Sequence, residues 1–502
     1  MSPNSFLLPG LLVLLALGQC RCQQLPLVAS DSDDWDLRTP PNPNTTGHLV
    51  FDTVSSLLVH WPNTNYHNGH TIVPGTIPTG MLLYHGRNDP DAPTAREWVS
   101  TDPEFARLFC VEPTDCWLLT VVTTRPLRIL YFDGSSATKM PDGPMDSQDL
   151  LIWGEVLPER ATPEWEYERL HNLCDNFEFD GILRMQLNFE LMLCSFTDGV
   201  TTQSLVRLED EERFPHYAYG FLDSSRWNDD FPGLSRIHLD LTRLISLYDT
   251  SLAPSLIPFR YGKSRRAHRV LGIDDRDTQA VLASVRALSS THPPGSGIDW
   301  RNMFQSIRDR YAIRLEVLHD VLAEDDSSMQ QRAFRIIQML LLPYRLHNAV
   351  PSSSDSADEM WAAPVFRLCA AAHTSFAESD SVRAKFTASE HLLLAAVRET
   401  HKEICRTLVG MWADGVVYNT ASKSTSDETE LVRRWRREVQ RLMEWLGWSE
   451  WVKCRPACVF PESCYYPGAP FSMEEWNSTT PRCVRLFEPY AGIPEEYIID
   501  SI

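Results

Sequence analysis

The spacing of apolar residues changes near the middle of this 502-residue chain, and that change constrains the fold more than any other feature. Before Tyr248, short runs rich in β-branched and aromatic residues recur between turn signals such as Asp133-Gly134 and Asp198-Gly199, which is typical of strands. After Asp277, apolar residues recur at helical spacing. We therefore predict an α+β fold, in which a mixed α/β domain is followed by an α-helical region and a Cys-rich tail.

The individual elements can be placed within these two regions. Strands are expected over Gly80–His85, Cys116–Val122, Leu127–Phe132, Leu187–Phe196 and Ile237–Leu241. Helices are expected among them over Asp102–Phe109 and Glu164–Phe177. In the second region we expect helices over Thr278–Leu288, Trp300–Ala323, Met329–Leu346, Ser389–Trp412 and Glu428–Trp445. Candidate N-cap residues are Asp277, Ser328, Ser389 and Asp427.

Composition marks the boundaries between the parts. A signal peptide is expected over 1–22, and a polar, Pro-rich and flexible leader over 23–46. A Ser- and Asp-rich stretch over 351–358 is expected to be a linker. The remaining domains are an α+β domain over 47–255, helical regions over 256–350 and 359–450, and a Cys-rich tail over 451–502.

The N-terminus indicates secretion. Phe6–Leu17 is apolar but shorter than the roughly 20 residues of a membrane span, so it fits the core of a secretory signal peptide. Glycosylation motifs at Asn44 and Asn477 point to the same compartment. No later apolar stretch has the length of a membrane span, so we expect a secreted, extracellular protein without one.

The twelve cysteines suit disulfide pairing in an oxidising compartment. Pairs close in sequence are expected, namely Cys110–Cys116, Cys174–Cys194 and Cys369–Cys405. The C-terminal cluster fits either two disulfides of open connectivity or a zinc site; its members are Cys454, Cys458, Cys464 and Cys483. Disulfides are favoured there because no pair of histidines follows at zinc-finger spacing.

Charge and motifs exclude several classes of protein. The net charge of −21 argues against nucleic acid as a partner, because an acidic surface repels phosphates. The sequence has no His-Glu-x-x-His zinc motif, no Gly-x-Ser-x-Gly nucleophile motif and no Gly-x-Gly-x-x-Gly dinucleotide motif. We therefore predict no resident metal or cofactor, and we leave the oligomeric state open.

One carboxylate within an apolar run is the strongest candidate for chemistry. Glu190 lies in the expected strand, where a buried carboxylate is costly unless it is paired or functional. Alternation places Phe189 and Leu191 on one face and Glu190 with Met192 on the other. Glu190 is thus either turned to solvent or a buried functional group.

Three short motifs within residues 75–200 carry a resemblance. They are Leu83-Tyr84-His85-Gly86-Arg87, Trp98-Val99-Ser100-Thr101-Asp102 and Glu190-Leu191-Met192-Leu193. Their order resembles the ADP-ribosyltransferase superfamily, whose members carry a His or Arg on the first core strand, then a Ser-Thr or Tyr element, and a Glu on a late strand. The wider chain is similar to uncharacterised secreted fungal proteins.

The resemblance implies an ADP-ribosyltransferase-like domain with NAD as its substrate, in either a glycohydrolase or a transferase. His85 or Arg87 would contact the ribose or phosphate of NAD. Ser100 and Thr101 would brace the site. Glu190 would bind the nicotinamide ribose and stabilise the positive charge that develops as the N-glycosidic bond breaks.

Two departures and two alternatives accompany this resemblance. Asn188 stands where arginine-specific transferases carry an acidic residue, and the tyrosine that stacks on nicotinamide has only Phe105 or Phe109 as positional counterparts. The chain is alternatively an inactive extracellular binding or structural protein, with a carbohydrate groove among the candidates Trp61, Trp98, Trp117 and Trp153. A glycoside hydrolase would instead pair Glu178 with Glu190.

Overall fold

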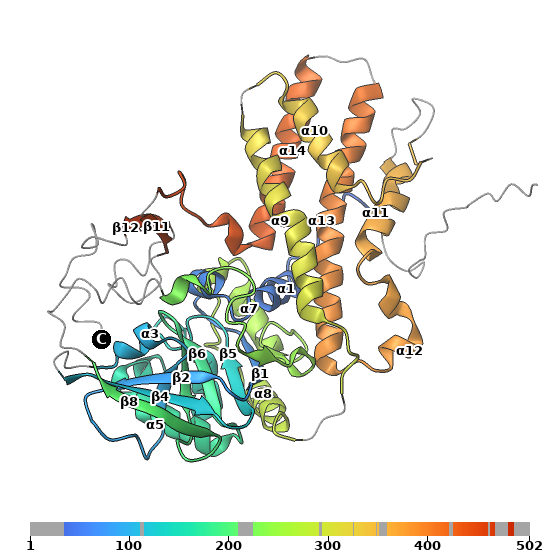
Figure 1. Ribbon diagram of the computed structural model, residues 1–502. Helices are drawn as coiled ribbons and strands as arrows, with labels where there is room; N and C mark the ends of the chain where they lie inside the picture. Colours follow the sequence, from blue (N-terminus) through green and yellow to red (C-terminus); the bar gives the residue numbers. More distant parts are fainter. Residues whose placement is uncertain are drawn as a thin grey trace, which may run out of the picture.

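The computed structural model shows a sheet domain from which a bundle of long helices rises (Figure 1). It describes residues 35–110, 115–208, 224–290, 294–324, 326–347, 349–350, 359–420, 425–459, 462–466 and 480–485. The expected signal peptide, the first half of the leader (23–34), the linker over 351–358 and the glycosylation motif at Asn477 lie outside the described residues.

The sheet domain is built on a ten-stranded sheet with the order β10-β1-β5-β6-β7-β3-β2-β4-β8, and β9 also pairs with β1. Its strands are β1 (Thr71–Ile77), β2 (Leu82–Arg87), β3 (Glu97–Ser100), β4 (Trp117–Thr123), β5 (Leu127–Phe132), β6 (Gly181–Met185), β7 (Phe189–Leu193), β8 (Val200–Arg207), β9 (His238–Leu239) and β10 (Ile245–Ser246). Among the strands that the structure describes, only β5 and β6 pair in parallel. The tail contributes a separate hairpin of β11 (Glu462–Tyr465) and β12 (Arg482–Arg485).

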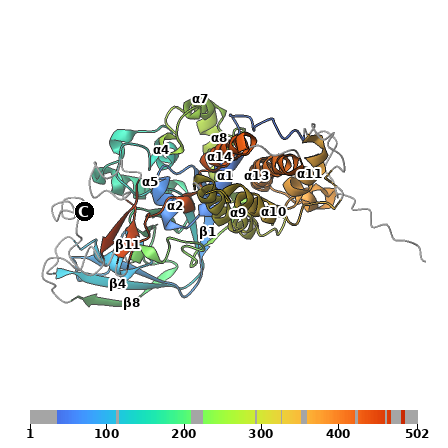
Figure 2. The same cartoon turned by 90° about the horizontal axis from the view of Figure 1, so that it is seen from above.

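The helices that precede or cover the sheet are α1 (Gly47–Ser56), α2 (His60–Asn65), α3 (Pro103–Arg107), α4 (Asp146–Trp153), α5 (Glu166–Asn176), α7 (Ile257–Arg260) and α8 (Asp275–Ala287). The helices of the second region are α9 (Trp300–Ala323), α10 (Met329–Leu340), α11 (Ala363–Ala371), α12 (Asp380–Arg383), α13 (Ala388–Thr420) and α14 (Thr425–Leu446). Among them α9, α10, α13 and α14 form the bundle, and α11 packs against α13 (Figure 2). No helix among the described residues is long and apolar enough to cross a membrane.

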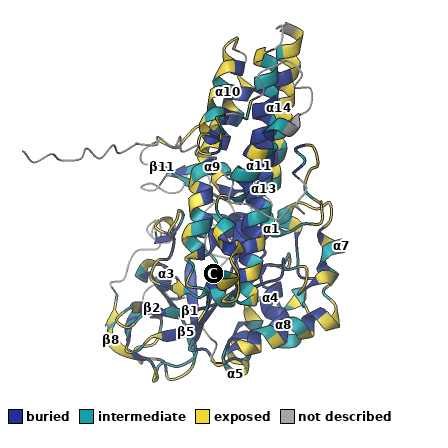
Figure 3. Ribbon diagram, turned by 90° about the vertical axis from the view of Figure 1, so that its right-hand side faces the viewer, coloured by how far each residue is buried: buried dark blue, intermediate teal, exposed yellow. Residues whose placement is uncertain are grey.

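Both faces of the sheet are buried at the central strands β6 and β7, whereas the edge strand β8 is mostly exposed. One face, which includes Val99 and Leu191, belongs to the same apolar core as Phe304 of α9 and Leu408 of α13. The other face, which includes Met192, packs against α4, α5 and α8. Helix α1 precedes the sheet in sequence but packs against α13, α9 and α14, so buried residues gather where the bundle meets the sheet (Figure 3).

Most predicted elements are present, with two informative differences. The α+β expectation is confirmed at the level of a mixed α/β sheet domain followed by helices. Strand β1 was not expected, because Pro74 and Gly75 are turn residues. The Pro74 carbonyl accepts the Asp240 N–H at 2.8 Å, on the edge of β1 that faces β9 and β10. The missing N–H of Pro74 would point to this same edge. Because β9 and β10 are only two residues long each, the sheet tolerates the loss of that hydrogen bond.

The second difference concerns the start of α8. Its N-cap is Asp274, whose side chain accepts the N–H of Asp277, so the predicted cap lies one turn too late. The Asp277 carboxylate instead accepts the N–H of Ser255 at 2.8 Å and so fastens α8 to a neighbouring loop. Asp274 and Asp277 are both suitable N-cap residues for α8. The contact between Asp277 and Ser255 leaves Asp274 as the N-cap.

Disulfides form as the cysteine spacing predicts. The three expected pairs, Cys110–Cys116, Cys174–Cys194 and Cys369–Cys405, are all present. In the tail cluster, Cys454 pairs with Cys464 and Cys458 pairs with Cys483, so disulfides are formed there rather than a zinc site. The tail hairpin is thereby fixed by two covalent links.

Candidate functional site

Glu190 lies in the interior of the sheet domain. Its side chain points to the face covered by α4 and α5, and the residue is only 1% exposed. The alternative that alternation turns Glu190 to solvent is therefore wrong, because both faces of β7 are covered. Arg184, its register partner on β6, places Nη2 2.5 Å from Glu190 Oε1.

Arg184 is the centre of a buried ionic network. It also contacts Glu166 Oε2 at 2.6 Å and Gln148 Oε1 at 3.2 Å. Burial alone raises the pKa of Glu166, but the charges of Arg184 and Lys139 outweigh it and lower the pKa to about 2. The network ties β6 and β7 to α4 and α5, so the Glu190 carboxylate is already neutralised by a partner.

Ser100 is brought next to Glu190 by strand register. The two residues are direct partners across β3 and β7. The Ser100 hydroxyl donates to the Phe189 carbonyl at 3.3 Å and accepts the Asp102 N–H at 3.1 Å. Thr101 bonds to the Asp102 carboxylate at 3.1 Å. The Ser-Thr element thus braces the end of β3, beside the predicted carboxylate.

His85 and Arg87 lie on the opposite face of the sheet. Tyr84 is the register partner of Ser100, so alternation turns His85 and Arg87 away from the face of Glu190. His85 Nδ1 lies 2.6 Å from the Trp98 carbonyl, and burial lowers the pKa of His85 to about 4. Arg87 pairs with Asp89 at 2.9 Å. The structure therefore does not bring the two halves of the predicted site together.

Other sequence candidates are also separated. Phe105 and Phe109 pack against each other, with ring centroids 5.7 Å apart. Glu178 is exposed whereas Glu190 is enclosed, so these two carboxylates do not face one cleft. Trp98 packs on Tyr167, Trp117 donates to Asp115, and Trp153 lies under Arg160.

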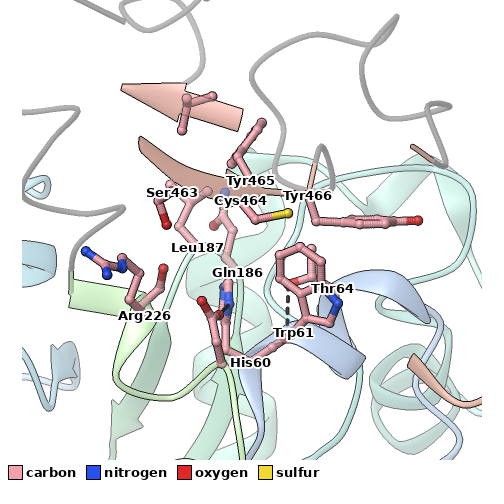
Figure 4. A pocket seen from close by; sticks show the side chains of 13 residues that line it. His60, Trp61, Thr64, Gln186, Leu187, Arg226, Ser463, Cys464, Tyr465 and Tyr466 are labelled. Atoms are coloured by element: carbon pink, nitrogen blue, oxygen red, sulfur yellow. Dashed lines mark hydrogen bonds and ion pairs between the residues drawn. The ribbon is translucent and has the colours of Figure 1, made fainter. Parts of the chain in front are cut away.

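Sequence reasoning missed a pocket that lies at one end of the sheet. It has a cavity volume of about 40 Å³ and lies between α2, the β6–β7 turn, the segment 225–229 and the tail hairpin. Ser463, Cys464, Tyr465 and Tyr466 lie over it, opposite His60 and Trp61 (Figure 4). Of the four tryptophans proposed for a groove, Trp61 lines this pocket.

The pocket wall combines polar and aromatic groups. His60, the first residue of α2, places Nδ1 2.7 Å from Asp229 Oδ1. Trp61 donates from Nε1 to the Val452 carbonyl at 2.9 Å, and its ring meets Tyr466 edge to face at 5.5 Å. Arg226 adds a cation to the rim. Such a wall presents aromatic ring surface together with hydrogen-bond donors and acceptors.

A polar chain connects this pocket to the Ser-Thr element. Asn188 donates from Nδ2 to Asp102 Oδ2 at 3.1 Å and to Ser224 Oγ at 3.0 Å. Ser225, the next residue, lines the pocket. Asn188 therefore acts as a structural link between two segments, which accounts for an amide at this position.

Comparisons with known proteins agree with a fungal relationship. The family described as YPL277C N-terminal domain matches residues 112–218, which include Glu190 but not His85 or Ser100. The Saccharomyces cerevisiae protein named "Uncharacterized protein YOR389W" is 22% identical over 537 aligned residues, which cover 86% of this chain and 83% of that protein.

A second yeast protein, "Uncharacterized protein YPL277C", is 26% identical over 217 aligned residues, covering 33% of this chain and 44% of that protein. No solved structure matches the chain. The chain is thus similar to uncharacterised fungal proteins, in one case along most of its length.

Proposed function

We propose that this chain is a secreted binding protein, and that its pocket beneath the tail hairpin takes a saccharide. The observation that carries the proposal is the composition of the pocket wall. Trp61 and Tyr466 offer aromatic surface, while the His60–Asp229 pair and Arg226 offer hydrogen-bonding groups. Sugars present an apolar face of C–H groups and a rim of hydroxyls, which such a wall complements.

The rigidity of the pocket wall supports the same function. The wall that carries Tyr465 and Tyr466 is held by the Cys454–Cys464 and Cys458–Cys483 disulfides. A wall fixed in advance reduces the entropy lost on binding. Five disulfides also suit the oxidising compartment of a secreted protein.

The test is saccharide binding. The folded, disulfide-intact protein is applied to an array of immobilised mono- and oligosaccharides, β-glucans, mannans and chitin fragments, and calorimetry then gives the affinity for the best binder. Trp61→Leu, which removes the ring and keeps apolar volume, is expected to weaken binding about two- to tenfold, since an aromatic contact contributes roughly 0.5–1.5 kcal/mol. Trp117→Leu, outside the pocket, is the matched control. Absence of binding, or equal binding by Trp61→Leu, would refute the proposal.

A second candidate is NAD cleavage at Glu190. The position of Ser100 directly opposite Glu190 favours it, because both belong to the implied site. The ion pair with Arg184 weighs against it, since a paired carboxylate stabilises a developing cation less. Nicotinamide release from NAD, lost in Glu190→Gln, would support cleavage. No release by the folded parent protein would leave saccharide binding as the surviving candidate.

A further inference from the structure

Two Cys-His pairs face each other where α11 meets α13, far along the chain from the pocket residues. Cys369 lies on α11 and His373 follows four residues later, just past the end of that helix. His401 and Cys405 are also four residues apart, on α13. Four residues is about one helical turn, so each pair presents its side chains on one side.

Three of the four side chains converge on one point, and the fourth, His373, lies beside them. The ligand atoms of Cys369, His401 and Cys405 all lie within 4.8 Å of one another, and Cys405 Sγ is 3.7 Å from His401 Nε2. The rings of His373 and His401 meet edge to face, with centroids 4.8 Å apart. Cys369, His401 and Cys405 are all 0% exposed.

The two histidines differ in how the surrounding protein uses them. Among the described residues, the buried His373 Nε2 has no hydrogen-bond partner. His401 Nε2 lies 3.1 Å from the Tyr311 hydroxyl, on the side of the cysteines.

We propose that reduction of the Cys369–Cys405 disulfide converts this cluster into a zinc site, with Cys369, Cys405, His401 and His373 as ligands. Two thiolates and two imidazoles are a usual tetrahedral ligand set for Zn²⁺. Their charges balance those of the ion, which suits a buried site. Calcium and magnesium prefer oxygen ligands, so they do not fit.

The conversion needs little movement. In a tetrahedral site with Zn–S bonds of about 2.3 Å, two sulfurs lie about 3.8 Å apart. Rotation of the two cysteine side chains reaches this separation, because their Cα atoms are already only 5.8 Å apart. A dithiol reductant transfers two electrons and two protons to the disulfide and is itself oxidised to a disulfide. Zinc then displaces both thiol protons to solvent.

The first measurement uses cobalt(II) as a spectroscopic probe for zinc. The full chain is reduced with a dithiol under native conditions, freed of reductant under argon and titrated with Co²⁺. Visible bands of tetrahedral, thiolate-bound cobalt that Zn²⁺ abolishes are expected from the reduced protein and not from the oxidised one. His401→Gln is expected to weaken cobalt binding at least tenfold, whereas His391→Gln, an exposed position on the same helix, leaves it unchanged.

The second measurement separates this cluster from the tail cysteines, which also become thiols. Alkylation of each cysteine in the reduced protein is followed peptide by peptide, with Zn²⁺ or with a chelator. Zinc is expected to slow alkylation of Cys369 and Cys405 at least tenfold in the parent and less in His401→Gln and His373→Gln. Equal alkylation rates with and without zinc would overturn the proposal, as would protection that both histidine variants keep. Loss of helical circular dichroism in the reduced, zinc-loaded protein would overturn it too.

Discussion

Removal of Arg184 should destabilise the sheet domain strongly. Arg184 is 0% exposed and holds the carboxylates of both Glu190 and Glu166. In Arg184→Met these two groups remain buried without their main partner. Breaking a buried ion pair in this way costs about 3–5 kcal/mol. The depressed pKa of Glu166, about 2 against an ordinary 4.5, corresponds to about 3 kcal/mol, to which Lys139 and Arg169 contribute together with Arg184.

The same pKa fixes the direction of the pH dependence. A carboxyl whose pKa is lower in the folded state contributes stability above its unfolded pKa, and this stability is lost as the pH falls from about 4.5 towards 2. The parent protein therefore loses this contribution in acid. In Arg184→Met, Glu166 already contributes less stability at neutral pH. The difference in free energy of unfolding between parent and variant should therefore narrow below about pH 4.

Urea unfolding followed by tryptophan fluorescence measures both effects. We expect a lower midpoint for Arg184→Met at pH 7, and a smaller difference between variant and parent at pH 3.5. Arg128→Met, at an exposed position of β5, is the matched control and should change stability by less than about 0.5 kcal/mol. A loss under about 1 kcal/mol at pH 7, or a difference independent of pH, would refute the reasoning.

Two further substitutions test the helical elements. Trp435→Ala removes a fully buried ring that stacks on Phe334 at 6.1 Å, and should lower the free energy of unfolding by about 3–5 kcal/mol. A thermal midpoint within a degree of the parent would contradict this. Asp274→Ala removes the N-cap of α8 and should cost about 1 kcal/mol, measured by urea unfolding. If Asp277→Ala lowered the free energy of unfolding several-fold less than Asp274→Ala, the hydrogen bond between Asp277 and Ser255 would contribute little to stability.

The sequence predicts those features that depend on neighbours along the chain. Helix α9 begins and ends where its apolar spacing predicts. Asp299 caps its N-terminus, and its apolar residues recur at helical spacing along its length. Disulfides between nearby cysteines follow from spacing for the same reason. The burial of Glu190 was one of two open alternatives, since alternation assigns a face but does not tell which faces are covered.

Features that depend on strand register or on distant segments escape the sequence. Strand β2 pairs with β3 in a register that sets Tyr84 opposite Ser100, and this register places His85 on the face away from Glu190. No local sequence pattern encodes that register. The pocket joins Trp61 to Val452, which are 391 residues apart. Trp61 was predicted as a candidate for a carbohydrate groove, but the residues that line the pocket with it could not be inferred from composition.

The packing of α1 on α13 has a consequence for synthesis in the cell. The Gly47 N–H bonds to the Glu399 carboxylate, a partner 352 residues later. At about 5–20 residues per second, the ribosome needs roughly 20–70 s to make the intervening chain. Throughout that time Val50, Phe51 and Val54, which are buried in the finished protein, lack the helix that covers them. We therefore expect the apolar face of α1 to be open to chaperones in nascent chains, and chaperone binding at α1 should fall once residue 399 has emerged.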